Sequence, residues 1–367
     1  MLIKNMIMAI LVLGTVSQGI VCAENTPKPE LKNPIRFEIL ELRETPVIDK
    51  DHPDAKDNKY GFEGGSVVKL DGVYYLFTSE MAGDPFWVKM RLALWTSTNG
   101  IDWKRISTIK ETSGKSRAET GLPYESFWSP MPIYNDADKV WELFHVAYDT
   151  GGATGGRIWR VTSTVNGPAG IVGPYKDKGI ILQPDAESQK WEGHQGTASF
   201  YPYRVNDRWV AFYCSHGHGH GHGHGGAPGW QVGLSEAPTL TGPWKRRAEG
   251  NPLPIEPVFN ENPIVTRIGD LYVAVYDSDI VNATAPKNYK EKTSVGYTTS
   301  TDGINWSKGG RIVVQPPGPA NWSVDIRTPL GLIDEGNDTF TLFYTAEDNK
   351  RFWPVSKIKL KMVKETL

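Results

Sequence analysis

The chain has 367 residues, with 40 Lys and Arg against 42 Asp and Glu, so its formal net charge is −2. This balance excludes the basic footprint of a nucleic-acid-binding protein and leaves no acidic tail. Hydrophobic residues make up 39 % and charged residues 22 %, a composition typical of a globular protein rather than a disordered or membrane-spanning one. The 13 Trp, 15 Tyr and 12 Phe, together with 38 Gly and 26 Pro, favour short strands and many turns over long helices.

The first 23 residues have the pattern of a signal peptide. Lys4 precedes an apolar segment at 6–16, and Val21-Cys22-Ala23 resembles a small-residue cleavage site. The apolar segment is too short to span a bilayer, and Val21 stands where a lipid-attachment motif has a small residue. We therefore expect a secreted or periplasmic protein with no membrane attachment.

After a polar, Pro-rich linker at 24–36, one pattern recurs along the chain. A short apolar run meets a turn containing Gly, Asp or Asn, and an aromatic-rich run follows it. Two strand-length runs around such a turn predict a β-hairpin. The five copies are residues 66–77, 130–148, 199–213, 263–276 and 329–344.

A second pattern follows the hairpins. TSTNGIDW at 96–103 matches TSTDGINW at 299–306 position for position, and the middle copies end in GPY at 173–175 and GPW at 242–244. Each unit therefore has about four strands and recurs every 50 to 70 residues, which is the signature of a radial or stacked repeat.

These repeats predict an all-β protein: a single five-bladed β-propeller of four-stranded antiparallel blades over residues 37–367. We expect residues 36–42 to add a strand to the last blade and so close the ring.

In a propeller the innermost strand of each blade starts beside the central axis, so the residues before each hairpin are candidates for function. Glu63 and Glu261 each precede a hairpin Tyr, Tyr74 and Tyr272, by eleven residues. Equivalent positions in blades one and four place the two carboxylates across a central pocket. Paired carboxylates are what glycoside hydrolysis needs, one as acid and one as base or nucleophile. The competing interpretation is that both are surface acids near loops.

Further candidates precede the other hairpins. Trp128 is a candidate sugar-stacking platform or a core residue, and Glu192 with His194 is a candidate for tuning the proton affinity of the acids. Arg327 with Asp325 is either a ligand for substrate hydroxyls and carboxylates or a structural pair. The expected catalytic residues are Glu63, Glu261 and Glu192; the expected substrate-binding residues are Glu125, Trp128, His194, Asp325 and Arg327.

The hairpin sequences resemble glycoside hydrolase family 43 and its five-bladed relatives. Glu63 followed by SVVKLDGVYYLF is similar to the family's first blade, in which an acidic residue precedes an apolar strand and a Gly-Tyr-Tyr hairpin. Phe-Trp-Ser-Pro at 127–130 is similar to its Trp-Ala-Pro stretch, and Glu261-Asn262-Pro263 resembles the stretch that carries its general acid. The resemblance covers roughly residues 60–345 and implies a five-bladed glycosidase with an inverting mechanism.

Three departures mark the chain as a divergent relative. The family's base is usually Asp, where this chain has Glu63, and a second-blade Asp that tunes the acid is replaced by Met131. The family's acid lies on the third blade, whereas Glu261 falls on the fourth. Arabinosidase or xylosidase activity is therefore not carried over.

The run HGHGHGHGHGG at 216–226 holds five of the eight histidines. Alternating imidazoles bind zinc or nickel, but Gly between them fixes no geometry, so a low-complexity loop is the favoured interpretation. We expect no required cofactor and no metal in the active site; the sequence does not say whether an ion lies on the axis.

The sequence thus predicts a secreted, exo-acting glycoside hydrolase whose substrate is an oligosaccharide or polysaccharide of plant or algal origin, with no nucleic-acid partner. Two alternatives stay open. One is a carbohydrate-binding propeller without catalysis, and the other is a phosphorolytic relative, for which Arg327 is one phosphate ligand without a convincing second.

Overall fold

The computed structural model describes residues 31–112, 126–149, 154–216, 229–257, 260–278, 294–314, 322–323, 325–348 and 350–365. The predicted signal peptide and most of the predicted linker lie outside these residues. Within them the chain forms strands and two short 3-10 helices, η1 (Pro53–Ala55) and η2 (Pro168–Val172). No helix in this described part has the length and apolarity needed to cross a membrane.

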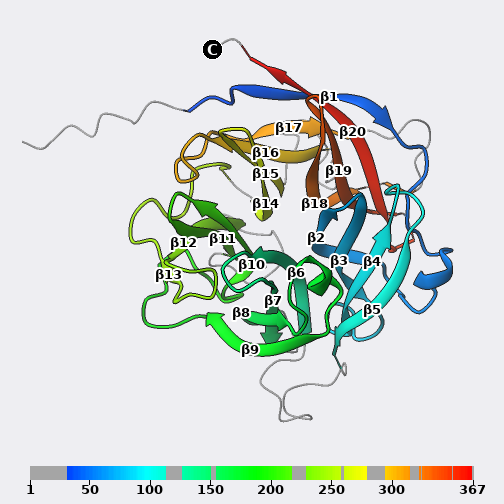
Figure 1. Cartoon of the computed structure of the whole chain (residues 1–367), viewed down its shortest axis with the longest axis horizontal. Helices are drawn as coiled ribbons and strands as arrows, with labels where there is room; N and C mark the ends of the chain where they lie inside the picture. The colour runs from blue at the N-terminus through cyan, green and yellow to red at the C-terminus, as the bar shows by residue number, and fades with distance from the viewer. Residues whose placement is uncertain are drawn as a thin grey trace, which may run out of the picture. The chain divides into compact units, whose positions relative to one another are not determined.

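The strands form five four-stranded antiparallel sheets arranged as the blades of a propeller, as the repeats predict (Figure 1). Blade 1 is β2 (Phe62–Leu70), β3 (Val73–Met81), β4 (Met90–Ser97) and β5 (Lys104–Glu111); blade 2 is β6 (Ser126–Asn135), β7 (Val140–Asp149), β8 (Thr154–Ser163) and β9 (Tyr175–Leu182); blade 3 is β10 (Ala198–Val205), β11 (Arg208–His216), β12 (Trp230–Ala237) and β13 (Lys245–Arg246); blade 4 is β14 (Glu261–Ile268), β15 (Leu271–Asp277), β16 (Ser294–Ser300) and β17 (Gly310–Val313); blade 5 is β18 (Asp325–Gly336), β19 (Thr339–Glu347), β20 (Val355–Lys364) and β1 (Ile35–Leu42). The five predicted hairpins are the first two strands of the five blades.

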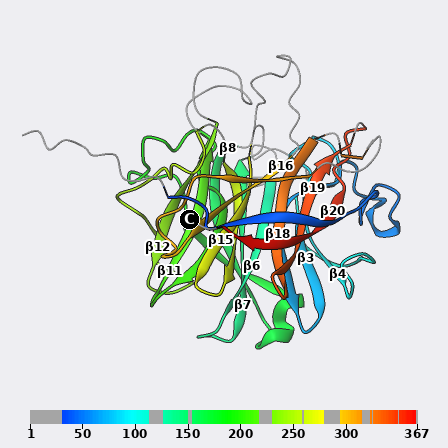
Figure 2. The same ribbon diagram turned by 90° about the horizontal axis from the view of Figure 1, so that it is seen from above.

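The ring closes as predicted, because β1 pairs with β20 as the outermost strand of blade 5 (Figure 2). Backbone hydrogen bonds also join the start of blade 1 to the β19–β20 connection of blade 5. The Phe62 amide donates to the Trp353 carbonyl at 2.9 Å, and the Trp353 amide donates to the Tyr60 carbonyl at 2.9 Å. Segments from the two ends of the described chain are thus hydrogen-bonded to each other in two places, through β1 and β20 and through the contact of Tyr60 and Phe62 with Trp353.

The two matching turn motifs have the same hydrogen-bond pattern. In the first, Asn99 Oδ1 accepts from the backbone amides two and three residues further on, both at 2.8 Å. In the second, Asp302 Oδ1 does the same, again at 2.8 Å. Such Asx turns form because a short polar side chain replaces a backbone acceptor. Trp103 and Trp306, which end the motifs, are both buried.

The core lies between neighbouring blades and is built largely from aromatic side chains. This explains the aromatic-rich composition, since two facing sheets leave a layer that large side chains fill. The largest fully buried side chains are Trp95, Tyr213, Tyr276, Tyr344, Phe62, Phe77, Phe144, Phe200, Phe212, Phe340, Phe343 and Ile48.

Every innermost strand begins with a β-bulge at the same place. In blade 1 the ladder advances three residues from Phe62 to Gly65 while β3 moves only from Glu80 to Thr78. An extra residue of this kind bends a strand and redirects its side chains. The equivalent bulges follow Trp128, Ala198, Glu261 and Ile326. The innermost strands contact one another around the axis, so the bulges gather at one end of it.

The contact that joins Gly61 to Trp353 provides a test of ring closure. Gly61 has φ +90°, and a Cβ there would lie 2.3 Å from the Trp353 carbonyl oxygen. Gly72 also has a positive φ, +79°, but a Cβ there would meet nothing within 4 Å. We expect Gly72→Ala to lower the free energy of unfolding by about 1–2 kcal/mol through backbone strain alone. Gly61→Ala should cost at least about 3 kcal/mol, because overpacking adds to the strain.

Urea unfolding of the two variants measures the difference. Equal losses would mean that the Gly61–Trp353 contact does not constrain the ring.

Candidate functional site

Five side chains at equivalent bulge positions surround the axis, and we call them the bulge ring: Glu63, Ser129, Ser199, Asn262 and Arg327. Ser199 Oγ donates to Asn262 Oδ1 at 2.5 Å, and Ser129 Oγ donates to the same oxygen at 3.3 Å. Blades 2, 3 and 4 are thereby hydrogen-bonded to one another. The three residues share a left-handed backbone, with φ between 49° and 52°.

Glu63 is the only acidic member of the bulge ring, and its side chain is buried. Its Oε1 accepts from Thr328 Oγ1 at 2.8 Å and from Arg327 Nη2 at 3.2 Å, so blade 5 holds the carboxylate of blade 1. Its Oε2 is buried and accepts no hydrogen bond from the described residues. One oxygen is therefore fixed in place, while the other is left for a partner that the described residues do not supply.

Arg327 connects Glu63 to a group of aromatic rings. Its guanidinium carbon lies 5.9 Å from the Trp87 ring centre and 6.0 Å from that of Trp353, within the range of a cation–π interaction. Arg327 thus balances the charge of Glu63 and is oriented by two indoles.

The aromatic group, which we call the aromatic platform, comprises Tyr60, Phe86, Trp87, Trp128 and Trp353. Phe86 stacks on Trp353 with ring centres 5.5 Å apart, and Trp87 lies 5.3 Å from Trp128. Trp128 and Trp353 are buried, whereas Phe86 is 38 % exposed and Trp87 is half-buried. Trp128 therefore packs beneath the accessible rings. These are Tyr60, which precedes β2, and Phe86 and Trp87 of the β3–β4 connection, and none of them was a predicted site residue. An exposed aromatic surface beside hydrogen-bonding groups suits the face of a sugar ring.

Glu347, at the end of β19, is a further carboxylate beside Glu63 and Arg327. Burial raises the pKa of Glu347 above its ordinary value, the positive charge of Arg327 opposes this, and the negative charge of Glu63 adds to the increase. A carboxyl group with a raised pKa retains its proton closer to neutral pH and so has the character of an acid.

The Glu347 environment predicts a pH dependence of stability. Because the folded-state pKa is raised, this group favours folding fully below the ordinary carboxyl pKa of 4.5, and the contribution is lost as pH rises through the folded-state value. Glu347→Gln stays neutral, so its stability relative to the wild type should increase as pH rises and then level off. Urea unfolding between about pH 3 and about pH 8 measures this, and a difference independent of pH would contradict it.

Glu261 begins β14 at the same end of the propeller as Glu63, but the two positions are not equivalent. The arm from bulge to turn pairs six residues in blade 1, Gly65 to Leu70, and five in blade 4, Ile264 to Ile268. Counting eleven residues back from the hairpin tyrosine therefore reaches the bulge residue in blade 1 but the residue before it in blade 4. The structural equivalent of Glu63 is Asn262. The prediction of a matched register was wrong in this respect, although it identified the right end of the right strands.

The position of Glu261 is nevertheless distinctive. In the other four blades the equivalent residue is a buried apolar side chain: Phe62, Trp128, Ala198 and Ile326. Glu261 instead is partly exposed and acts electrostatically on Tyr148 and Cys214, and its charge adds to the effect of burial in raising the pKa of both.

Blade 4 places a second carboxylate beside Glu261, because Asp277 is its direct partner in the β14–β15 ladder. Asp277 is buried, and so is Asn260, whose side-chain amide has no hydrogen-bond partner among the described residues. Directly opposed residues in an antiparallel pair have neighbouring side chains. The start of blade 4 is thus a concentration of buried polar groups.

Glu192, an expected catalytic residue, does not lie at the bulge ring. It accepts from Arg246 Nε at 2.7 Å and from Tyr213 Oη at 2.9 Å, and Arg246 belongs to the outermost strand of blade 3. Blade 4 repeats the arrangement, since Arg311 on its outermost strand and Tyr276 both bind Glu256. Two blades with the same buried ion pair indicate a structural lock of the outer strand, a feature that sequence order alone does not distinguish from catalysis.

This assignment predicts a stability effect. Glu192→Gln removes the buried counter-charge of the Arg246 guanidinium and leaves only the exposed Asp185, 3.1 Å from Arg246 Nη1, so it should lower the free energy of unfolding by about 3 kcal/mol. Glu187→Gln, in the same connection but exposed, is the matched control and should change it by less than about 0.5 kcal/mol. Urea unfolding checks both, and equal small effects would show that the ion pair does not hold the outer strand.

The remaining predicted residues lie in different settings. His194 is exposed and its ring contacts that of His216, with centres 5.9 Å apart. Glu125 lies outside the described residues, and Asp325 is placed by its backbone, which pairs with Glu347 in the β18–β19 ladder. The His-Gly run beyond His216 also lies outside them. Within the described ranges, no group of three or more His, Cys, Asp or Glu is arranged to hold a metal ion.

Comparison with known proteins adds structural relatives. No family model matches the sequence, and no curated protein matches it. Among solved structures, CoXyl43, a GH43 β-xylosidase/α-arabinofuranosidase from a compost microbial metagenome in complex with xylotriose, is 15 % identical, with 91 % of this chain and 98 % of that chain covered and a TM-score of 0.56. Zg3597, a family 117 glycoside hydrolase from the marine bacterium Zobellia galactanivorans, is 13 % identical over 89 % and 90 %, with a TM-score of 0.59. A third structure, named only as a glycoside hydrolase, is 16 % identical over 88 % and 92 %, with a TM-score of 0.63.

At these identities the likeness concerns the fold. The chain has the five-bladed architecture that named glycoside hydrolases share, which confirms the predicted resemblance at the level of fold. What the chain does must be argued from its own side chains.

Proposed function

We propose that this protein is a secreted glycoside hydrolase that removes terminal sugars from a plant or algal polysaccharide. The observation that carries the proposal is Glu63, a buried carboxylate in the bulge ring with one oxygen fixed and the other without a partner among the described residues. The aromatic platform beside it supports a sugar as the ligand, and the fold shared with named glycoside hydrolases supports hydrolysis as the reaction.

Glu63 acts as general base or nucleophile in this proposal. Thr328 and Arg327 hold Oε1 by hydrogen bonds, and Arg327 places a positive charge beside the carboxyl group. Oε2 is then available to take a proton from water or to attack the anomeric carbon. We propose the first of these, with inversion of configuration.

Glu261 acts as the general acid. It follows directly after Asn260 and precedes the bulge-ring residue Asn262, and Asp277 is opposite it. The Glu261 carboxyl group thus lies next to a second carboxyl group, as the paired acids of a glycosidase site do. Glu347 is the second candidate acid, because its pKa is raised and it lies beside Glu63.

Two leaving groups separate the roles of the carboxylates. Glu63→Gln should lower kcat by about 10²–10⁴-fold on every aryl glycoside, because activation of the attacking group is always needed. Glu261→Gln should lower kcat by a similar factor on a phenyl glycoside and by much less on a dinitrophenyl glycoside, whose leaving group needs no protonation. Glu347→Gln serves as the matched carboxylate variant: leaving-group dependence in this variant and not in Glu261→Gln would transfer the acid role to Glu347.

The substrate must first be found by screening plant and algal oligosaccharides, with product stereochemistry followed by NMR. Release of a product of inverted anomeric configuration supports the proposal. Near-normal turnover in both Glu63→Gln and Glu261→Gln would overturn the assignment of residues, and sugar binding without turnover by the wild type would favour a non-catalytic binding propeller.

A further inference from the structure

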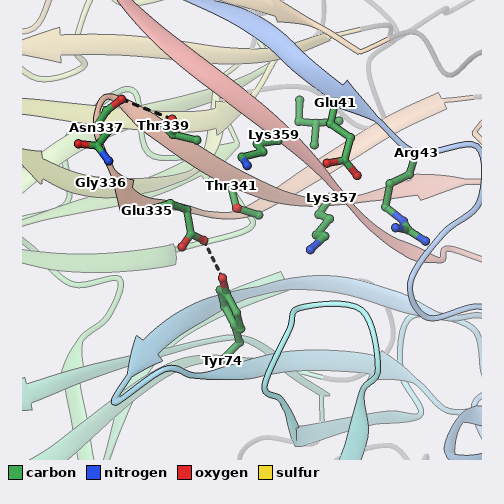
Figure 3. A pocket seen from close by; sticks show the side chains of 11 residues that line it. Glu41, Arg43, Tyr74, Glu335, Gly336, Asn337, Thr339, Thr341, Lys357 and Lys359 are labelled. Carbon is green, nitrogen blue, oxygen red and sulfur yellow. Dashed lines mark hydrogen bonds between the residues drawn. The ribbon is translucent and has the colours of Figure 1, made fainter.

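A hollow of about 400 Å³ lies at the opposite end of the strands from Glu63. It is lined by β1, β20 and the β18–β19 hairpin of blade 5, with Tyr74 of blade 1 across from them (Figure 3). β2 carries Glu63 near its start and Lys69 near its end, six residues later, so the two sites are about 20 Å apart along the strand. The hollow is therefore separate from the candidate active site.

Cations dominate the charge of the hollow. Arg43, Lys357 and Lys359 line it, and none of the three has a carboxylate within ion-pairing distance among the described residues. Lys357 and Lys359 stand two residues apart on β20 and so share one face of the strand. The Lys357 ammonium donates to the Asn99 carbonyl at 3.1 Å, and Arg43 Nε donates to the Thr45 carbonyl at 3.3 Å; neither contact neutralises charge.

The carboxylates of the hollow, Glu41 and Glu335, offset these cations only in part. Glu335 accepts from Tyr74 Oη at 2.7 Å and is ion-paired with Lys69, so its charge is already balanced. Hydrogen bonds from these partners, which outweigh the effect of burial, lower the pKa of Glu335. Among the described lining residues, Glu41, which is the direct ladder partner of Lys359, is then the one other carboxylate, and it faces three cations.

The environment of Lys357 reflects the repulsion between these cations. Burial lowers the pKa of Lys357, the neighbouring charges of Arg43 and Lys359 lower it further, and the negative charges of Glu41 and Glu335 oppose this without reversing it. An ammonium group whose charge is disfavoured in this way gains from an anion placed beside it.

Uncharged hydrogen-bonding groups complete the lining. Asn337, Thr339 and Thr341 lie along the hairpin side of the hollow, next to the cations. Hydroxyl and amide groups of this kind bind sugar hydroxyls, and the volume is within the range of small-ligand sites.

We propose that this hollow binds an oxyanion carried by a sugar, either a uronate carboxylate or a sulfate ester, as a second carbohydrate site on the face opposite Glu63. We infer an oxyanion from the unpaired cations alone. The inference that a sugar carries it rests on the proposed function. Free phosphate or sulfate has the same charge chemistry, so the experiment must separate the two sources.

Calorimetric titration at constant ionic strength tests the proposal with four probes: a galacturonate trisaccharide, a sulfated galacto-oligosaccharide, a neutral galacto-oligosaccharide and inorganic phosphate. We expect saturable binding of at least one anionic oligosaccharide, about tenfold or more weaker binding of the neutral one and of phosphate, and weakening with added salt. Lys357→Gln and Lys359→Gln should each weaken the anionic probe by about tenfold.

Lys364→Gln is the matched control, since it removes the same charge from the exposed end of the same strand and should leave the affinity unchanged. Glu63→Gln locates the site: if it abolishes binding while the lysine variants do not, the probe occupies the candidate active site and the proposal is overturned. If phosphate binds as tightly as the oligosaccharides, the proposal that a sugar carries the oxyanion is overturned. If none of the four probes shows saturable binding, the proposal of an anion site is overturned. Lysine-dependent binding in a protein that hydrolyses no glycan would leave this inference standing while the proposed function fails.

Discussion

Convergence of five strands on one axis is the constraint on which the rest of the structure depends. Each innermost strand meets its neighbours there, and each begins with a bulge that turns one side chain into the ring. The bulge ring leaves space for small or mutually paired groups: Ser129, Ser199 and Asn262 hydrogen-bond to one another, and Glu63 pairs with Arg327. A buried charge at such a position needs an opposite charge beside it. The one acidic residue of the bulge ring, Glu63, is therefore paired with its one basic residue, Arg327.

The fold was predictable because its signals are local and repeated. Each hairpin carries its own turn residues and strand-length apolar runs, and the matched Trp-ending motifs fix the unit length. The closing strand β1 was predictable as well, since four strands per blade and the available segments leave residues near 36–42 for the last sheet. What local patterns do not encode is the number of residues between turn and bulge, which differs by one between blades 1 and 4.

This difference of one residue explains one of the errors in the predicted site. Glu63 and Arg327 were identified because they directly precede hairpins, and the structure brings them into contact. Glu261 was identified with the wrong equivalence, and Glu192 satisfies the same sequence criterion while pairing with an outer strand. Glu347 and Asp277 were missed although a signal existed: the second strand of an antiparallel hairpin returns to the end where the first begins, so its last residue faces the same site. Trp87 and Phe86 were missed because a connection between strands has no repeat to reveal it.

The two ends of the strands differ in chemistry in a way that agrees with separate roles. The bulge end gathers carboxylates, one guanidinium and an aromatic platform, which suit bond cleavage. The opposite end, between blades 5 and 1, gathers cations with hydroxyl and amide groups and no comparable aromatic surface among its lining residues, which suits retention of an anionic chain.

The proposed catalysis requires that the bulges bring acidic residues from distant parts of the chain around one bound sugar. A crystal structure with an oligosaccharide product bound tests it most directly. We predict a sugar ring against Trp87, with the carboxyl groups of Glu63 and of its acid partner, Glu261 or Glu347, about 6.5–9.5 Å apart on either side of the anomeric carbon. A sugar bound away from the bulge ring would contradict this. So would a bound sugar whose anomeric carbon lies near Glu63 but out of reach of the carboxyl groups of both Glu261 and Glu347.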